Sequence, residues 1–196
     1  NVDYNFDKYE LGEAAKALYN FVWNDFASWY VEISKVDLQG EDEANKLNTK
    51  NVLIYTLKAI IKMLHPFCPF ITEELYQALP HNEESISISE WPKANAAYDD
   101  EQASLAFDDL CEVITSIRNE RAKANKAPSK PIDITISCKD EDALSKLQAA
   151  ESYLVKFTNP KNLVLTLDQI SSEGNVLVVL SKANIYIPNS DLVDAK

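Results

Sequence analysis

The spacing of apolar residues changes once along this chain, and the change limits the folds that it can adopt. Before Pro128 the apolar residues recur every three or four positions, which is the spacing of amphipathic helices. After Pro128 the spacing falls to two, and the isoleucines of 132–136 alternate with polar residues as in a half-buried strand. The pattern predicts a mainly α protein, with a helical bundle over residues 1–127 and a small α+β module over residues 128–196.

Within these two parts, periodicity and chain-breaking residues predict the individual elements. Pro66 ends one helix near His65, and Pro69 suits the first turn of the next. Helices are expected over residues 8–35, 49–64, 69–79, 101–125 and 141–157, with a loop over 36–48 and a short extended piece over 85–89. Strands are expected over residues 132–136, 163–167, 176–180 and 183–187.

Composition excludes several classes of protein. Only three glycines occur, which excludes glycine-rich phosphate loops and the dinucleotide fingerprint. The three cysteines are an odd number and form no C-x-x-C, which excludes a disulfide framework and a thiolate zinc site and favours a reducing, cytoplasmic compartment. No apolar stretch approaches the roughly 20 residues that span a bilayer, so no membrane association is expected.

No arrangement of side chains predicts catalysis or metal binding. The two histidines are His65, in an apolar Pro-containing segment that favours a structural role, and His81, in an acidic loop. Neighbouring acids such as Asp99 and Asp100 diverge in direction and are typical of solvated charge rather than of a carboxylate pair. We therefore expect no catalytic residue, no metal and no cofactor in this chain.

Positive charge gathers in one segment of an otherwise acidic chain. The formal net charge is −12, yet the only two arginines and three lysines lie within thirteen residues against one acid. These residues are Arg118, Arg121, Lys123, Lys126 and Lys130. Two interpretations stay open: the arginines cover the end of their helix or pair with acids elsewhere, or they present guanidinium groups to phosphates.

The first helix offers a second candidate surface. Lys16, Tyr19, Asn20, Trp23 and Tyr30 combine a cation, an amide and flat aromatic rings beside the main apolar stripe. Single-stranded bases are held by this combination of stacking and hydrogen bonding. The alternative is that the rings belong to a wide apolar face inside the bundle.

Four segments, in order along the chain, resemble the anticodon-binding region of valyl-tRNA synthetases. They are FVWNDFASWYVE at 21–32 with Lys35, LHPFCPFITEELYQALP at 64–80, EWP at 90–92, and the run from IRNERA to PSK at 117–130. In the second segment a tyrosine stands where tryptophan is commoner in the family. The first two segments distinguish the valyl from the isoleucyl family, which shares the P-x-x-PF element.

The resemblance implies a parent class I aminoacyl-tRNA synthetase that attaches valine to its tRNA. Its nucleotide-binding fold, which uses ATP with Mg, and its editing domain are expected upstream. The parent is expected to be cytoplasmic and monomeric. The chain begins at Asn1 without a methionine and reads as an excised fragment, and a C-terminal coiled-coil arm is expected to follow near residues 194–196.

The resemblance also implies roles for particular residues. Trp23 and Phe26 are expected to stack on anticodon bases, and Lys16, Asn20 or Asp25 to contact base edges. Arg118 and Arg121, with Lys123, Lys126 and Lys130, are expected to hold the RNA backbone.

Two alternatives to this function are kept. One is the anticodon-binding domain of an isoleucyl-tRNA synthetase. The other is a helical protein-interaction module whose acidic surface binds a basic partner.

Overall fold

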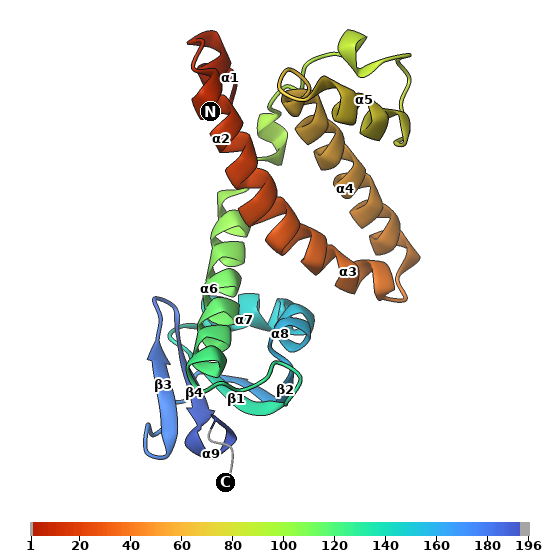
Figure 1. Ribbon diagram of the computed structural model, residues 1–196. Helices are drawn as coiled ribbons and strands as arrows, with labels where there is room; N and C mark the ends of the chain where they lie inside the picture. Colours follow the sequence, from red (N-terminus) through yellow and green to blue (C-terminus); the bar gives the residue numbers. More distant parts are fainter. Residues whose placement is uncertain (1, 193–196) are drawn as a thin grey trace. The chain divides into compact units, whose positions relative to one another are not determined.

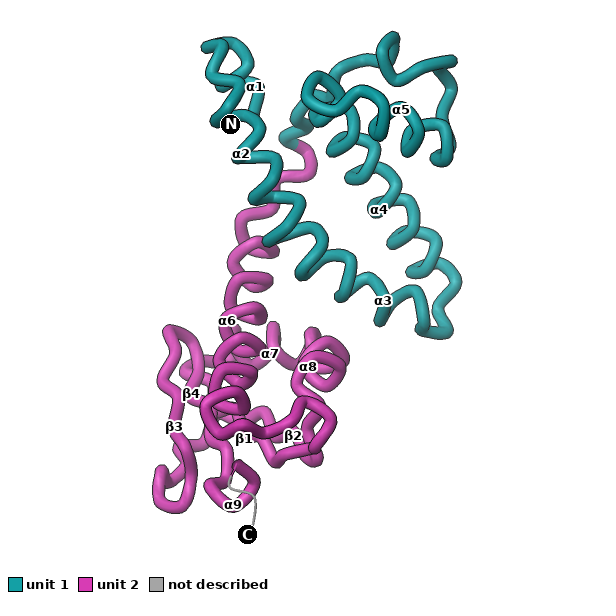
Figure 2. Tube along the Cα trace, viewed as in Figure 1, with its two compact units in different colours: residues 1–96 teal, residues 97–196 magenta. Residues whose placement is uncertain are grey.

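The computed structural model describes residues 2–192, which belong to two compact units (Figures 1 and 2). The first unit covers residues 1–96 and is helical, and the second covers residues 97–196 and contains the only sheet of the described residues. The predicted fold class, a helical part followed by a small α+β part, is confirmed. The arm expected near residues 194–196 lies outside the described residues.

The first unit is built on one long helical segment. A short helix, α1 (Val2–Asp7), is separated from the next helix by a turn in which Tyr9 has a positive φ of 58°. Helix α2 (Leu11–Asn20), the π-helix η1 (Phe21–Tyr30) and α3 (Val31–Gln39) then continue into one another, because the residues at both junctions keep right-handed helical geometry. The predicted single helix is confirmed, although it starts and ends later in the chain than expected.

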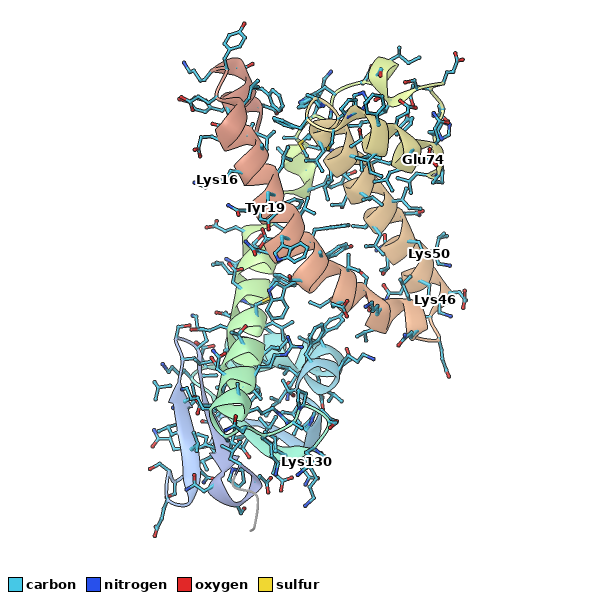
Figure 3. All side chains as sticks on the ribbon, in the orientation of Figure 1. Lys16, Tyr19, Lys46, Lys50, Glu74 and Lys130 are labelled. Atoms are coloured by element: carbon cyan, nitrogen blue, oxygen red, sulfur yellow. The ribbon has the colours of Figure 1, made fainter. Side chains whose placement is uncertain are left out.

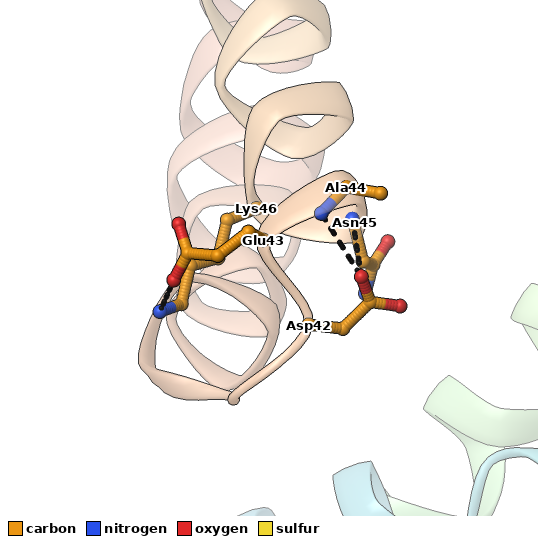
Figure 4. A network of polar contacts seen from close by, with 5 residues as sticks. All are labelled: Asp42, Glu43, Ala44, Asn45 and Lys46. Atoms are coloured by element: carbon orange, nitrogen blue, oxygen red, sulfur yellow. Dashed lines mark hydrogen bonds and ion pairs between the residues drawn. The ribbon is translucent and has the colours of Figure 1, made fainter.

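Helix α4 (Glu43–Leu64) begins earlier than the sequence predicted, and an N-terminal cap explains the difference. One carboxylate oxygen of Asp42 accepts the backbone N–H groups of Ala44 and Asn45 at 2.9 and 3.1 Å (Figure 4). The cap satisfies two of the helix's free donors. The loop predicted over residues 36–48 is therefore wrong and shrinks to residues 40–42, between α3 and α4.

Helix α5 (Pro69–Gln77) starts at the proline that was predicted to open it and packs against α4. His65, at the end of α4, contacts the hydroxyl of Thr72 through Nδ1 at 2.7 Å and that of Ser87 through Nε2 at 3.1 Å. The ring thus joins α4 to α5 and to the following turn, in agreement with a structural role. Tyr76 of α5 is fully buried beside Ile61.

The end of the first unit is mostly irregular. The extended piece predicted over residues 85–89 is wrong: residues Ile86–Ile88 form a 3-10 helix, η2, with Ile86 in the core beside Tyr76. A second 3-10 helix, η3 (Ala96–Tyr98), spans the division between the two units at residues 96 and 97.

The second unit places helices against a four-stranded sheet. The elements are α6 (Glu101–Lys123), β1 (Ile132–Cys138), α7 (Glu141–Ala149), α8 (Glu151–Thr158), β2 (Pro160–Thr166), β3 (Asn175–Val179), β4 (Ala183–Pro188) and α9 (Asn189–Leu192). The strands lie in the order β2-β1-β4-β3, with β1 and β2 parallel and the other two pairs antiparallel. The predicted helix over 141–157 is divided at Ala150 into α7 and α8.

The core of the second unit lies on one face of the central strands. Ile136 of β1 stands opposite Ile185 of β4, and both are fully buried. Helix α6 packs against α7 and α8, and α7 packs against β1 and β2. The compact units thus divide at residues 96 and 97, and α6 lies on the sheet side of this division, whereas the sequence was divided at 127 and 128.

Candidate RNA-binding surface and the arginine cap

The first candidate surface is an exposed aromatic pair on the long helix. The rings of Tyr19 and Trp23 are nearly parallel, with 8° between their planes and 6.4 Å between their centroids. They are 64% and 61% exposed, which is unusual for rings of this size. Lys16 and Asn20 of the same helix are also exposed. Lys16 and Tyr19 are labelled in Figure 3. We call Lys16, Tyr19, Asn20 and Trp23 the aromatic platform.

The helix is locally wider where the platform ends. Residues 21–30 follow the π-helical pattern, and the N–H of Val31 donates to the carbonyl of Phe26, five residues back. The hydroxyl of Ser28 donates to the carbonyl of Trp23 at 2.6 Å, again five residues back. Because π-helical turns are rare and occur often at functional sites, this geometry favours a functional role for the segment that carries Trp23.

The charges around the platform are mixed. The ammonium group of Lys16 lies 3.9 Å from a carboxylate oxygen of Glu13, and both side chains are exposed. Asp25 is exposed as well. An exposed pair at this distance contributes little, so Lys16 keeps most of its capacity to bind an anion.

Phe26 is not part of the exposed surface. Its side chain is only 9% exposed, and its ring packs against that of Tyr30 at 6.1 Å. The expectation that Phe26 stacks on a base is corrected here, since its side chain is buried and not available to a base. Burial also raises the pKa of the Tyr30 hydroxyl, and the nearby Asp37 raises it further.

Arg121 is buried, with 3% of its surface exposed, and its guanidinium group faces backbone carbonyls rather than solvent. One terminal nitrogen donates to the carbonyls of Lys130 at 2.7 Å and Ala127 at 3.4 Å. The other donates to those of Thr158 at 2.6 Å and Asn159 at 3.0 Å. Burial lowers the pKa of Arg121. The expectation that Arg121 holds an RNA phosphate is therefore corrected.

Arg121 acts instead as a cap on another helix. Thr158 is the last residue of α8, and the carbonyls at a helix C-terminus lack partners within the helix and carry partial negative charge. Arg118 reaches the same helix end: its Nε donates to the carbonyl of Phe157 at 3.3 Å, and its guanidinium carbon lies 5.1 Å from the centre of the Phe157 ring. Arg118 remains exposed, so it alone of the two arginines presents its guanidinium group to solvent.

The three lysines that come after the arginines differ in their surroundings. Lys123 is exposed and pairs with Glu120 at 2.6 Å. Lys126 is half-buried, and Lys130 is exposed in the segment before β1 (Figure 3). The platform belongs to the first unit and these cations to the second, so each candidate surface is described within its own unit.

Sequence reasoning missed a third group of cations, on α4. Between residues 44 and 72 the chain holds four lysines and no acid, although the chain as a whole carries a net charge of −12. These lysines are Lys46, Lys50, Lys58 and Lys62 (the first two are labelled in Figure 3). The acid-free stretch was a signal available in the sequence.

Two further classes of site are not found in the part of the chain that the structure describes. Over residues 2–192, no three His, Cys, Asp or Glu side chains are grouped so that they could hold a metal ion. None of the helices in this range has the length and apolar character needed to cross a membrane.

Comparisons with known proteins agree with an RNA-binding surface. Residues 1–136 match the family described as the anticodon-binding domain of tRNA ligase. Valine--tRNA ligase of Listeria monocytogenes is 46% identical over 96% of this chain, and that of Bacillus cereus is 41% identical over 99%. The chain spans about a fifth of the length of these relatives, 21% and 22%. Because this match covers more than half of the chain, the chain belongs to the anticodon-binding domain family of tRNA ligases.

Proposed function

We propose that this chain is the anticodon-recognition module of a valine–tRNA ligase, and that its aromatic platform holds anticodon bases of the valine tRNA. The observation that carries the proposal is the exposed, parallel pair of Tyr19 and Trp23 in a member of an anticodon-binding family. Identities of 40–46% to valine--tRNA ligases over nearly the whole chain support valine as the amino acid of the parent.

The platform suits unstacked bases for a physical reason. A base that leaves the anticodon loop loses its stacking neighbours, and a flat exposed ring replaces them. Stacking alone tolerates every base, so selectivity for the middle and third anticodon bases falls to the polar groups beside the rings. Lys16, Asn20 and Asp25 supply a cation, an amide and a carboxylate that can contact base edges.

We propose that four cations of the second unit contact the RNA backbone, namely Arg118, Lys123, Lys126 and Lys130. Exposed cations bind phosphates without reading sequence, so these contacts fix position and add salt-dependent affinity. Arg121 is excluded from this role by its burial.

The parent enzyme supplies the chemistry. We propose that an upstream nucleotide-binding domain activates valine with ATP and Mg and then charges the tRNA, in a cytoplasmic, monomeric enzyme. The present chain contributes by holding the tRNA so that its far end reaches the active site.

The test uses the full-length ligase and valine tRNA with a cognate or an altered anticodon. Trp23→Ala is expected to lower charging of the cognate tRNA about 5- to 150-fold, because stacking on one aromatic side chain contributes roughly 1–3 kcal/mol. The preference for the cognate anticodon falls with it, because a base that no longer stacks on Trp23 is no longer held beside the polar groups that contact its edge. ATP-dependent activation of valine is unchanged.

Phe70→Ala is the matched control, because Phe70 is an aromatic residue of the same unit, on α5, and is 90% exposed. It is expected to leave charging unchanged. Equal charging by the Trp23→Ala enzyme and the parent, on both tRNAs, would refute the role of the platform.

A further inference from the structure

A groove on α4 has no role in the function proposed above. One hollow, of about 280 Å³, is lined by Lys58 and Lys62 of α4 and by Trp91 and Lys93 of the segment after η2. A second hollow, of about 470 Å³, shares Lys93 with the first and extends to α2. Because the two also share Tyr55, Ala59 and Pro92, they form one groove. Its size is on the scale of the roughly 300–1,000 Å³ clefts that hold small ligands.

The two α4 lysines are held in place without losing their charge. The ammonium group of Lys58 donates to the carbonyl of Pro80 at 3.0 Å, and that of Lys62 donates to the carbonyl of Glu90 at 3.2 Å. Both also lie within 6 Å of the ring of Tyr76. These partners are neutral, so each ammonium group keeps its positive charge and further N–H donors for an anion. Side chains already fixed in position lose less entropy on binding.

The aromatic side of the groove is also fixed. The ring of Trp91 packs edge-on against Phe6 at 5.2 Å, and its Nε1–H donates to Asp3 at 2.7 Å. Trp91 is nonetheless 37% exposed. Tyr55, from the neighbouring turn of α4, is more than half exposed. The groove therefore presents aromatic surface beside three cations.

The local charge is opposite to that of the chain. Three lysines and Glu90 line the 280 Å³ hollow, which leaves a net positive lining in a protein with a net charge of −12. The hydrogen bond from Tyr76 and, to a smaller extent, the charge of Lys62 lower the pKa of Glu83, which lies near that lysine. Acids elsewhere on the chain repel a polyanion, so electrostatic attraction favours its approach to this lining.

We propose that this groove, which we call the α4 groove, binds one nucleotide of an RNA strand, with its phosphate on Lys58, Lys62 and Lys93 and its base against Trp91 or Tyr55. The inference rests on the proposed function, since the RNA is the tRNA that the platform holds. It adds a second contact on the same unit, because no platform residue lines either hollow.

The first experiment measures the salt dependence of tRNA binding by the full-length ligase. The variant is Lys58→Gln/Lys62→Gln/Lys93→Gln, in which each amide can still donate to a carbonyl. Each neutralised phosphate of a single strand contributes about 0.7 to the slope of log affinity against log salt concentration, so the slope is expected to fall by about 0.7 for the one phosphate that the groove holds.

The charge-matched control is Lys8→Gln/Lys35→Gln/Lys161→Gln, whose three lysines are exposed and lie outside the groove. Its slope is expected to stay close to that of the unmodified protein. A groove variant with an unchanged slope, or a control variant with an equal fall, overturns the inference.

The second experiment needs no variant and so does not depend on the folding of one. The unmodified ligase is acetylated by an amine-reactive reagent with valine tRNA, with adenosine monophosphate, or with neither, and the extent of acetylation is read by mass spectrometry. The tRNA is expected to protect the groove lysines and not Lys35 or Lys161. Equal protection by the free nucleotide overturns the assignment to an RNA strand, and no protection by tRNA overturns the site.

The two proposals fail in different ways. Loss of the platform through Trp23→Ala changes the preference between cognate and altered anticodons. Loss of the α4 groove lysines lowers affinity for both tRNAs alike, because phosphates carry no sequence information. Normal anticodon preference with unprotected groove lysines would therefore reject the groove and leave the proposed function standing.

Discussion

Replacing Arg121 by alanine is expected to destabilise the second unit, because its guanidinium group joins three separate segments of that unit. The two shortest of its four bonds, to Thr158 at 2.6 Å and to Lys130 at 2.7 Å, connect the end of α6 to the end of α8 and to the segment before β1. A hydrogen bond from a charged donor contributes about 1.5–3 kcal/mol, so these two bonds give roughly 3–6 kcal/mol before any correction.

Two effects change this figure in opposite directions. Removal of the cation also removes the cost of burying it, which reduces the loss. It leaves carbonyls at the end of α8 without a donor and opens a void where the side chain lay, which increases the loss. We expect the free energy of unfolding of Arg121→Ala to fall by about 3 kcal/mol. For a unit of roughly 100 residues this corresponds to a Tm lower by about 12–24 °C.

The assay must follow the second unit specifically. All three tryptophans, Trp23, Trp29 and Trp91, lie in the first unit, so their fluorescence reports on that unit. Hydrogen exchange of peptides from β1 and β4, read by mass spectrometry, reports on the second. Arg121→Ala is expected to speed exchange in both strands.

Arg118→Ala is the matched control, since it removes the same side chain from the exposed face of the same helix. Its contact with the Phe157 ring is worth about 0.5–1 kcal/mol at an exposed site, and its 3.3 Å bond to the Phe157 carbonyl is exposed, so water replaces it in the variant. The loss is therefore expected to stay below about 1.5 kcal/mol. The reasoning is refuted if Arg121→Ala changes the stability by no more than Arg118→Ala does.

Two further predictions concern the first unit. Asp42→Ala removes the cap of α4 and is expected to lower the free energy of unfolding, measured by thermal unfolding, by about 1 kcal/mol. Glu43→Gln weakens an exposed ion pair and is expected to lower it by less than about 0.5 kcal/mol. Equal losses would contradict the capping role. Burial and the bond to Glu83 raise the pKa of Tyr76 from 10 to about 12. The neutral phenol is therefore favoured in the folded state, and its contribution to stability is complete below pH 10 and is lost as the pH rises from 10 towards 12. Tyrosinate absorbance should show a late-ionising group that Tyr76→Phe removes, and an unchanged titration in that variant would argue against the assignment.

Periodicity predicted most of the fold because burial imposes it. The isoleucines of β1 were recognised by their spacing of two, and all three are buried, as are the following Ser137 and Cys138. The start of α4 could not be found in this way, because Asn45 and Asn48 look like loop residues. A cap formed by a single carboxylate, that of Asp42, decided the outcome, and short polar residues do not prevent a helix once its first turn is fixed.

The candidate site was predicted in part. The aromatic side chains of the first helix were expected to form either a stacking surface or part of the core. The structure divides them, because Tyr19 and Trp23 are exposed whereas Phe26 is buried. Spacing predicted that these residues share a helix but not how widely the partner helices cover it. That coverage depends on contacts between segments distant in the chain, which a single sequence does not reveal.

The burial of Arg121 was only partly predictable from its spacing along α6. This residue continues the stripe of Leu110, Ile114 and Ile117, and all three are buried. Arg121 lies four positions after Ile117 and Arg118 lies four positions after Ile114, so both face the side of the stripe, yet only Arg121 is buried. The spacing therefore did not distinguish the two arginines. What the sequence could not supply was the partner, since the acceptor carbonyl of Thr158 lies 37 residues further along the chain.

The distribution of charge, rather than its total, sets how an RNA can approach this chain. The cations concentrate in two stretches, the acid-free residues 44–72 of the first unit and residues 118–130 of the second, while the rest of the chain is acidic. Arg121 belongs to the second stretch but does not contribute to its surface, because it is buried. The count of five basic residues in 118–130 therefore overstates the positive charge exposed on the second unit. It also leaves out the four lysines of α4 and so understates the positive charge of the first unit. Since repulsion from the acidic remainder acts on every other approach, electrostatic attraction on each unit favours approach of an RNA to that unit's own stretch before any base is read.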